Sequence, residues 1–166
     1  MRGLALFVAG LVVGGIAVSA AVAQNEHSSP NKGIVALNHI CIVVPDIDKA
    51  VDYYTKVMGF PEAFRVKNAQ GQIQLVYVQI SQNTFIEIQP ATPDKPAGLN
   101  HFGVQVENVK DAMAMYKARG ANVIPGNPSA TKAVLANVAD PNGIRMEMTE
   151  LPPESLHRQA MNRWKP

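Results

Sequence analysis

Two histidines and two glutamates have the side chains and the spacing for metal chemistry. His39 lies in LNHICIVV and His101 in LNHFGVQV, each at the start of an apolar run. Glu87 lies in FIEIQ and Glu147 in RMEMT, each between two apolar residues. Imidazole nitrogens and carboxylate oxygens together suit a divalent transition metal, and such sites can leave positions open for water or substrate. We therefore predict one metal ion (Zn, Ni, Co, Mn or Fe) with the ligands His39, Glu87, His101 and Glu147.

Each of these residues, taken alone, has a simpler interpretation. An isolated glutamate on a half-buried strand is usually the solvent-facing residue, and an isolated histidine is usually a hydrogen-bonded part of the structure. The repetition changes this balance, because His39 and His101, and likewise Glu87 and Glu147, occupy equivalent positions in two similar halves of the chain. One shared site explains all four placements.

The elements that must position these residues also repeat. Each half reads as a strand, a helix and three further strands. Strands are predicted at about 34–44, 62–68, 73–80 and 84–89, and again at 99–106, 122–124, 132–138 and 144–149. Helices are predicted from Asp46 to Gly59 and over 108–119, from their capping residues and apolar spacing. A repeated supersecondary unit is a strong fold signal. We expect an α+β fold of two βαβββ modules, at 34–90 and 98–150, that form one domain over 34–150.

Strand alternation predicts which way the histidines face. In the first strand His39 shares a face with Cys41 and Val43, and in the second module His101 shares a face with Gly103. The opposite faces are more apolar and should meet the helices. All four candidate ligands are then expected on one concave side. Cys41 is interpreted as a small wall residue of this side rather than as a ligand or redox group.

The first 23 residues have the layout of a secretory signal peptide. Arg2 precedes a long uncharged apolar run that ends in Ala-Val-Ala, which favours cleavage before Gln24. A retained membrane anchor is the alternative, because about 20 apolar residues can span a bilayer. We expect residues 1–23 to be the signal peptide, residues 24–33 a flexible lead-in, and the protein to be exported, periplasmic or secreted.

Composition limits the partners. The chain has 166 residues and a net charge of +2, and loss of the leader removes only one basic residue. Such a balance gives no reason to expect nucleic acid as a partner, and a membrane only if the leader stays uncleaved. Cys41 is the single cysteine, so the fold rests on its core without a disulfide. We expect a small-molecule substrate. The connector 90–98 leaves open whether the site forms in one chain or across a homodimer.

The remaining histidines lie outside the repeat. Residues 151–166 predict a short C-terminal helical tail that starts at Pro152-Pro153. His157 in this tail and His27 in the lead-in are interpreted as surface residues.

The chain resembles the vicinal oxygen chelate superfamily, which includes glyoxalase I, methylmalonyl-CoA epimerase, bleomycin and fosfomycin resistance proteins and extradiol dioxygenases. LNHICIVVPDIDKAVDYYTKVMGF looks like the opening strand and helix of that family, and ADPNGIRMEMTE like its closing turn and strand. The resemblance covers about residues 34–150. It implies paired βαβββ modules that curl around a metal, with ligands at His39, Glu87, His101 and Glu147. The presence of Glu87 favours the four-ligand glyoxalase I and epimerase branch.

Three positions depart from specific members of that family. Val43 stands where glyoxalase I carries an arginine that anchors glutathione, and Gln89-Pro90 replaces an asparagine of the glyoxalase pattern. The stretch RVKNAQGQ holds no acidic residue where the epimerase has a second catalytic glutamate. Export would also separate the protein from CoA esters and most glutathione.

The resemblance implies proton transfer next to a metal-bound carbonyl of a small oxygenated substrate. Glu147 is the favoured catalytic base and Glu87 the second candidate. We expect an exported metal-dependent lyase or isomerase of the glyoxalase type. The alternatives are a metal-dependent dioxygenase and a metal-free small-molecule binding protein of the resistance type.

Overall fold

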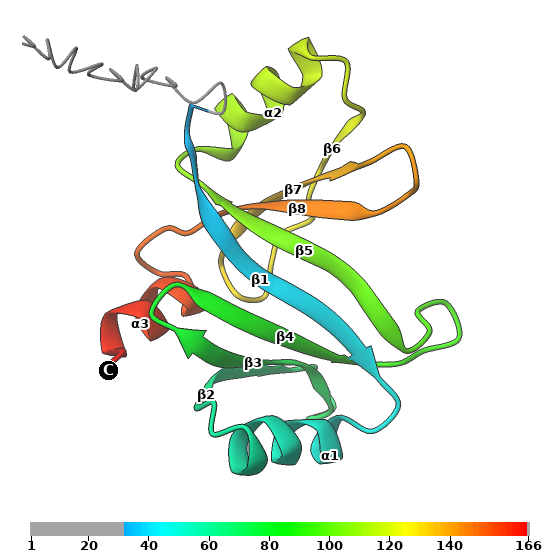
Figure 1. Cartoon of the computed structure of the whole chain (residues 1–166), viewed down its shortest axis with the longest axis vertical. Helices are drawn as coiled ribbons and strands as arrows, with labels where there is room; N and C mark the ends of the chain where they lie inside the picture. Colours follow the sequence, from blue (N-terminus) through cyan, green and yellow to red (C-terminus); the bar gives the residue numbers. More distant parts are fainter. Residues whose placement is uncertain (1–31, 166) are drawn as a thin grey trace, which may run out of the picture. The chain divides into compact units, whose positions relative to one another are not determined.

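A computed structural model of the protein describes residues 32–165 (Figure 1). The predicted signal peptide and nearly all of the lead-in lie outside the described residues. Within the described range, no helix is long and apolar enough to cross a membrane.

Eight strands form one mixed sheet. The first module contributes β1 (Ile34–Val44), β2 (Glu62–Lys67), β3 (Ile73–Ser81) and β4 (Thr84–Pro90). The second contributes β5 (Gly98–Val106), β6 (Val123–Pro125), β7 (Val134–Ala139) and β8 (Arg145–Glu150). The strand order is β2-β3-β4-β1-β5-β8-β7-β6. The mixed sheet with few helices agrees with the predicted α+β class.

The two modules meet edge to edge along β1 and β5, which cross the middle of Figure 1 side by side. These two strands pair antiparallel, with His39 opposite Gly103 and Cys41 opposite His101. Each also pairs in parallel with the last strand of its own module, β1 with β4 and β5 with β8. The strands that carry the four candidate ligands are therefore the four central strands of the sheet.

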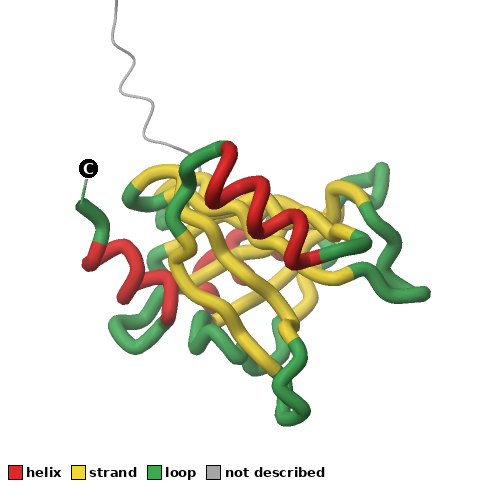
Figure 2. Tube along the Cα trace, turned by 90° about the horizontal axis from the view of Figure 1, so that it is seen from below, coloured by secondary structure: helices red, strands yellow, loops and turns green. Residues whose placement is uncertain are grey.

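The helix of the first module begins where its capping residue predicts. The Asp46 side chain accepts a hydrogen bond from the backbone N–H of Lys49 at the start of α1 (Ile47–Asp52). The chain continues as a π-helical turn over Tyr53–Val57 and leaves the helix through Gly59, whose φ is +75°. Figure 2 shows this helical segment lying across the strands of its module.

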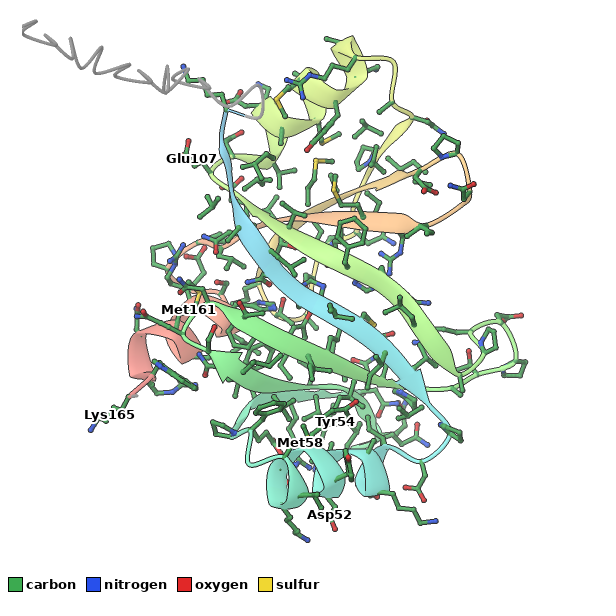
Figure 3. The ribbon with its side chains drawn as sticks, viewed as in Figure 1. Asp52, Tyr54, Met58, Glu107, Met161 and Lys165 are labelled. Atoms are coloured by element: carbon green, nitrogen blue, oxygen red, sulfur yellow. The ribbon has the colours of Figure 1, made fainter. Side chains whose placement is uncertain are left out.

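Helices α1 and α2 cover the outer face of the sheet. Tyr54 of the first helical segment packs in a cluster with Val76, Val78 and Ile88, whereas Asp52 points away from the sheet (Figure 3). Helix α2 (Val109–Ala118) is capped by Asn108. It packs on a second cluster, whose buried strand residues are Val106, Ala136 and Met148. Burial of a valine, isoleucine or methionine side chain in these clusters contributes about 1.5–3 kcal/mol.

Side chains alternate along each strand, so the two glutamates point to the inner face, away from α1 and α2. Glu87 precedes the outward Ile88, and Glu147 lies between Met146 and Met148 of the outer cluster. The prediction that the apolar faces meet the helices is confirmed.

Helix α3 (Leu156–Arg163) packs on the inner side of the sheet. Its Ala160 and Met161 belong to a third core cluster with Phe64 and Phe85. The predicted helix start at Pro152-Pro153 was wrong. The N-cap is Ser155, whose hydroxyl accepts from the backbone N–H of Arg158, and short polar side chains satisfy exposed helix donors in this way.

Candidate functional site

The structure brings the four predicted residues together within a single chain. Nε2 of His39 and Nε2 of His101 lie 3.1 Å apart. Oε2 of Glu87 lies 3.5 Å from the first of these nitrogens and 3.4 Å from the second. Oε2 of Glu147 lies 3.6 Å and 3.9 Å from the same two atoms.

These separations fit one divalent transition metal. Bonds of about 2.1 Å to nitrogen or oxygen place neighbouring ligand atoms about 3.0–3.4 Å apart. His39, Glu87 and His101 form the tightest group, with one ligand atom from each within 4.8 Å of the others. Glu147 is the outermost of the four, with a side chain that is 11% exposed against 5% for Glu87.

Strand register explains why the four meet. In each module the glutamate pairs with the residue two places after the histidine, as Cys41 with Glu87 and Gly103 with Glu147. Residues two apart on a strand share a face, so each glutamate lies diagonally across from the histidine of its own module. Antiparallel pairing of β1 with β5 then places the His39–Glu87 pair next to the His101–Glu147 pair. The sequence repeat becomes a site with approximate two-fold symmetry.

The residue two places after each histidine must be small. A Cβ added at Gly103 would lie 2.0 Å from Cε1 of His39. The His39 ring has little room to move, because its residue is fully buried and Tyr77 and His101 lie edge-on to it. The equivalent residue opposite His101 is Cys41, which is also fully buried.

An asparagine before each histidine holds the ring, which the sequence reasoning missed. Oδ1 of Asn38 lies 2.9 Å from Nδ1 of His39, and Oδ1 of Asn100 lies 2.9 Å from Nδ1 of His101. When Nδ1–H donates to the amide oxygen, Nε2 keeps its lone pair for a metal. Strand alternation alone would place Asn38 on the face opposite His39, but its side chain reaches the His39 ring, and the β1–β5 register shifts between Leu37 and His39. The repeated Leu-Asn-His was the available signal.

Arg145 is a second residue that the prediction missed. Its Nη2 lies 2.9 Å from Oδ1 of Asn100 and 2.5 Å from Nδ1 of His101. Its Nη1 lies 2.7 Å from Oδ1 of Asn137 and 3.3 Å from Oε1 of Glu147. Arg145 donates to Nδ1 of His101 only in the tautomer that carries the proton on Nε2, so this contact opposes the one from Asn100. The available signal was the position of Arg145, two residues before Glu147 on the same strand, which places both side chains on one face.

The two carboxylates have opposite electrostatic environments. Burial alone would raise the pKa of Glu87, but the hydrogen bond with His101 and the charge of His39 lower that pKa to about 2. Gln89 also donates to Oε1 of Glu87, at 2.5 Å. For Glu147, burial raises the pKa, and the negative charge of Glu87 adds to the effect. Burial also lowers the pKa of His39 to about 4, so this imidazole is neutral at pH 7.

A cavity of about 170 Å³ opens onto the four-residue cluster, and its lining includes Glu87, His101, Arg145, Glu147 and His157. The interpretation of His157 as a surface residue was wrong, because it is only 1% exposed. His27 lies outside the part of the chain that the structure describes.

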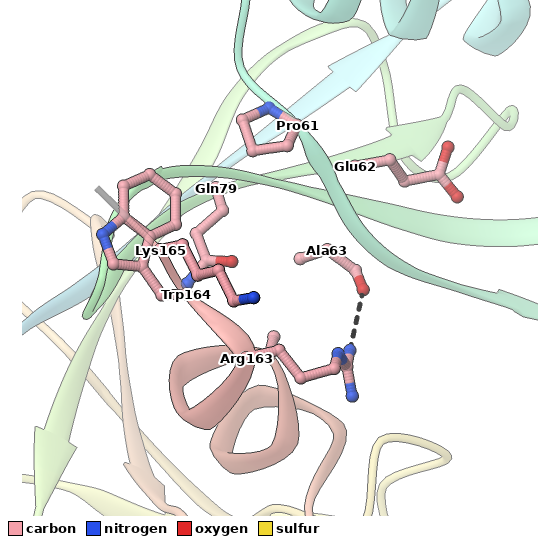
Figure 4. Close-up of a pocket in the computed structure, with 8 residues that line it drawn as sticks. Pro61, Glu62, Ala63, Gln79, Arg163, Trp164 and Lys165 are labelled. Carbon is pink, nitrogen blue, oxygen red and sulfur yellow. Dashed lines mark hydrogen bonds between the residues drawn. The ribbon is translucent and has the colours of Figure 1, made fainter.

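A separate, larger hollow of about 470 Å³ lies between α3 and β2 and contains none of the four cluster residues. Its lining includes Pro61, Gln79 and Trp164 (Figure 4).

Comparison with known proteins gives the family. Residues 38–137 match the family model of the glyoxalase, bleomycin resistance protein and dioxygenase superfamily. The chain is 26% identical over 106 residues to mitochondrial methylmalonyl-CoA epimerase of Mus musculus, and this match spans 58% of the chain and 60% of the mouse protein. It is 27% identical over 123 residues to lactoylglutathione lyase of Escherichia coli O157:H7, over 69% of the chain and 91% of that protein.

Solved structures show the same fold. Methylmalonyl-CoA epimerase from Mycobacterium tuberculosis superposes with a TM-score of 0.64 at 15% identity, over 73% of this chain and 91% of that one. A 2,3-dioxygenase from Pseudomonas sp. KL28 superposes with a TM-score of 0.59 at 22% identity, over 71% of this chain and 43% of that one. The chain belongs to the glyoxalase, bleomycin resistance protein and dioxygenase superfamily.

Proposed function

We propose that this protein is a metal-dependent lyase or isomerase that moves a proton next to a carbonyl of a small oxygenated substrate. The relatives support this class, since they are named as an epimerase and a lactoylglutathione lyase. The convergence of His39, Glu87, His101 and Glu147 supports it too, because this donor set fits a divalent metal. A metal bound there would supply positive charge beside the substrate oxygens, where negative charge develops.

Glu147 is the proposed base. A catalytic carboxylate works best when its pKa lies near the working pH, and the pKa of Glu147 is raised whereas that of Glu87 is lowered to about 2. Glu147 takes the proton from the carbon next to the carbonyl and returns it to the neighbouring carbon or to the opposite face. His39 and Glu87 hold their positions throughout. The single observation that carries this assignment is the more open position of Glu147, whose side chain is 11% exposed against 5% for Glu87.

The test compares Glu147→Gln with the wild type, each at measured metal content. Candidate substrates are 2-oxoaldehyde adducts of small thiols and methylmalonyl-CoA, assayed by turnover and by exchange of the substrate proton with deuterated solvent. We expect the variant to keep its metal and to lose turnover and exchange by about 100-fold or more, as loss of a general base does. Full metal content with wild-type turnover would remove the base role from Glu147.

A second candidate, a metal-dependent dioxygenase, is supported by one specific observation. Nε2 of His39, Nε2 of His101 and Oε2 of Glu147 lie within 3.9 Å of one another, and two histidines with one carboxylate form the ligand set of non-haem iron oxygenases. Oxygen consumption by the Fe(II)-loaded protein with a catechol would favour this candidate over the isomerase. A protein that binds no metal under any loading condition would instead favour the binding-protein alternative.

Export is proposed from the sequence of the leader alone. Fractionation of cells and N-terminal sequencing of the mature protein would test it. A mature chain that begins at Gln24 outside the cytoplasm is expected, and one that begins at Met1 would refute cleavage.

A further inference from the structure

Helix α3 adds a residue to the cavity from outside the two modules. His157 lies in the wall of the same cavity as Glu87, His101 and Glu147. Its ring stacks on that of His39, with ring centroids 6.3 Å apart and an interplanar angle of 28°. One wall of the cavity therefore comes from the C-terminal helix.

The His157 side chain is polar where the packing calls for an apolar ring. The residue is 1% exposed, and Phe64, Tyr77 and Phe85 present their rings to it at centroid distances of 4.9, 4.6 and 5.7 Å. Among the residues that the structure describes, neither ring nitrogen has a hydrogen-bond partner. A buried donor or acceptor without a partner destabilises a fold, and a phenylalanine would fill this position without that cost. An unsatisfied buried polar group of this kind calls for an explanation, and a hydrogen bond to a bound ligand is one.

The position of His157 is fixed by the packing of α3. The backbone N–H of Leu156 donates to the carbonyl of Thr131 at 2.9 Å. At the other end, Arg163 donates to the carbonyl of Ala63, as Figure 4 shows. Met161 lies in the core between them. One end of the helix is tied to the loop before β7 and the other to β2, so the ring is held ready for a ligand.

We propose that His157 is a substrate-binding residue. Its ring hydrogen-bonds a substrate oxygen that lies one carbon beyond the oxygens held by His39, Glu87, His101 and Glu147. This inference rests on the proposed function. Buried among aromatic rings, the neutral His157 ring offers one N–H donor and one acceptor nitrogen, which matches a hydroxyl group.

The cavity favours a compact oxyacid as the part of the substrate that enters it. Its volume of about 170 Å³ is below the roughly 300–1,000 Å³ of ordinary ligand pockets. Arg145, which also lines the cavity, provides a cation for a carboxylate. A three-carbon acid with oxygens on adjacent carbons can keep its carboxylate and 2-hydroxyl at the cluster and present its 3-hydroxyl to His157.

Glycerate and lactate test this inference, because they differ only in the 3-hydroxyl. Their dissociation constants are measured by calorimetry on the nickel-loaded protein, with wild type, His157→Phe and Met161→Leu as control. Met161 lies on the same helix as His157 and belongs to the core cluster against which that helix packs, but it does not line the cavity. We expect wild type and Met161→Leu to bind glycerate roughly 5–20-fold more tightly than lactate, and His157→Phe to bind both equally.

Stability separates a structural role from a binding role. His157→Phe should keep its nickel content and unfold at the same or a higher temperature without ligand, since it removes a buried unpaired polar group. A glycerate preference that persists in His157→Phe, or is absent from wild type, overturns the inference. If wild type exchanges substrate protons but shows no such preference, only the inference fails. If it neither exchanges protons nor binds either acid, the proposed function fails as well.

Discussion

The two halves of the site have equivalent candidate ligands but different surroundings. In the first half, His39 lies opposite Phe85 on β4, and Gln89 is the side chain that holds Glu87. In the second half, His101 lies opposite Arg145 on β8, whose guanidinium contacts the ring. Symmetric strands thus present an apolar ring on one side and a cation on the other.

From this difference we infer different tasks for the two halves. His39 is fully buried and touches one amide partner, and the pKa of Glu87 is held low, so the first half is a fixed pair of ligands. Glu147 has a raised pKa and is more exposed, and His101 has two competing contacts. We infer that the second half is adjustable, and that proton transfer belongs there.

The largest expected effect comes from Gly103→Ala. The new methyl group would collide with the His39 ring, which its neighbours hold in place. Metal affinity, measured by competition with a chromophoric chelator, should fall by about 100-fold or more, at the upper end of losses caused by residues around a metal site. Cys41→Ala is the matched control at the equivalent position and should change the affinity little. Equal affinities for the two variants would contradict the close approach at Gly103.

Next in size are the asparagines that hold the rings. Asn38→Ala and Asn100→Ala should each lower metal affinity about 10–100-fold, as loss of a histidine's supporting partner does. Adding Arg145→Met should partly restore affinity in Asn100→Ala, because it removes the donor that selects the wrong tautomer of His101. The same substitution should not rescue Asn38→Ala. If Arg145→Met rescued both asparagine variants, or neither of them, the two halves would not differ as the structure indicates.

The smallest effect concerns the metal-free protein at pH 7. Ionised Glu87 stabilises the fold because its pKa is lowered, and ionised Glu147 destabilises it because its pKa is raised. Glu87→Gln should therefore lower the free energy of unfolding, and Glu147→Gln should leave it equal or raise it. Thermal unfolding after chelation measures both. Shifts of the same sign would mean that the carboxylates do not differ as the structure indicates.

Strand-level features were predictable from the sequence. The strands, the capping residues Asp46 and Asn108, and the inward direction of the two glutamates follow from alternation and local hydrogen bonding, and the structure agrees. The convergence of the ligand set was predictable as well, because the repeat places His39 and His101 at equivalent positions of paired strands.

Features that depend on register or distant packing were not predictable. Asn38 reaches the His39 ring next to a register shift that no pattern of apolar residues encodes. His157 is buried because α3 folds back under the sheet, a tertiary contact without local signal. The tail was predicted to be helical, but its polar residues gave no indication that one of them faces the cavity.

Continuity of the sheet across β1 and β5 has a consequence for symmetry. A site assembled from two identical subunits must carry every substitution twice, so its halves stay equal. Here both halves belong to one polypeptide, and a single codon can change one of them alone. Arg145 and Phe85 occupy equivalent places yet differ in charge. Sharing one chain would permit the specialisation that we propose, in which one half holds the metal and the other transfers the proton.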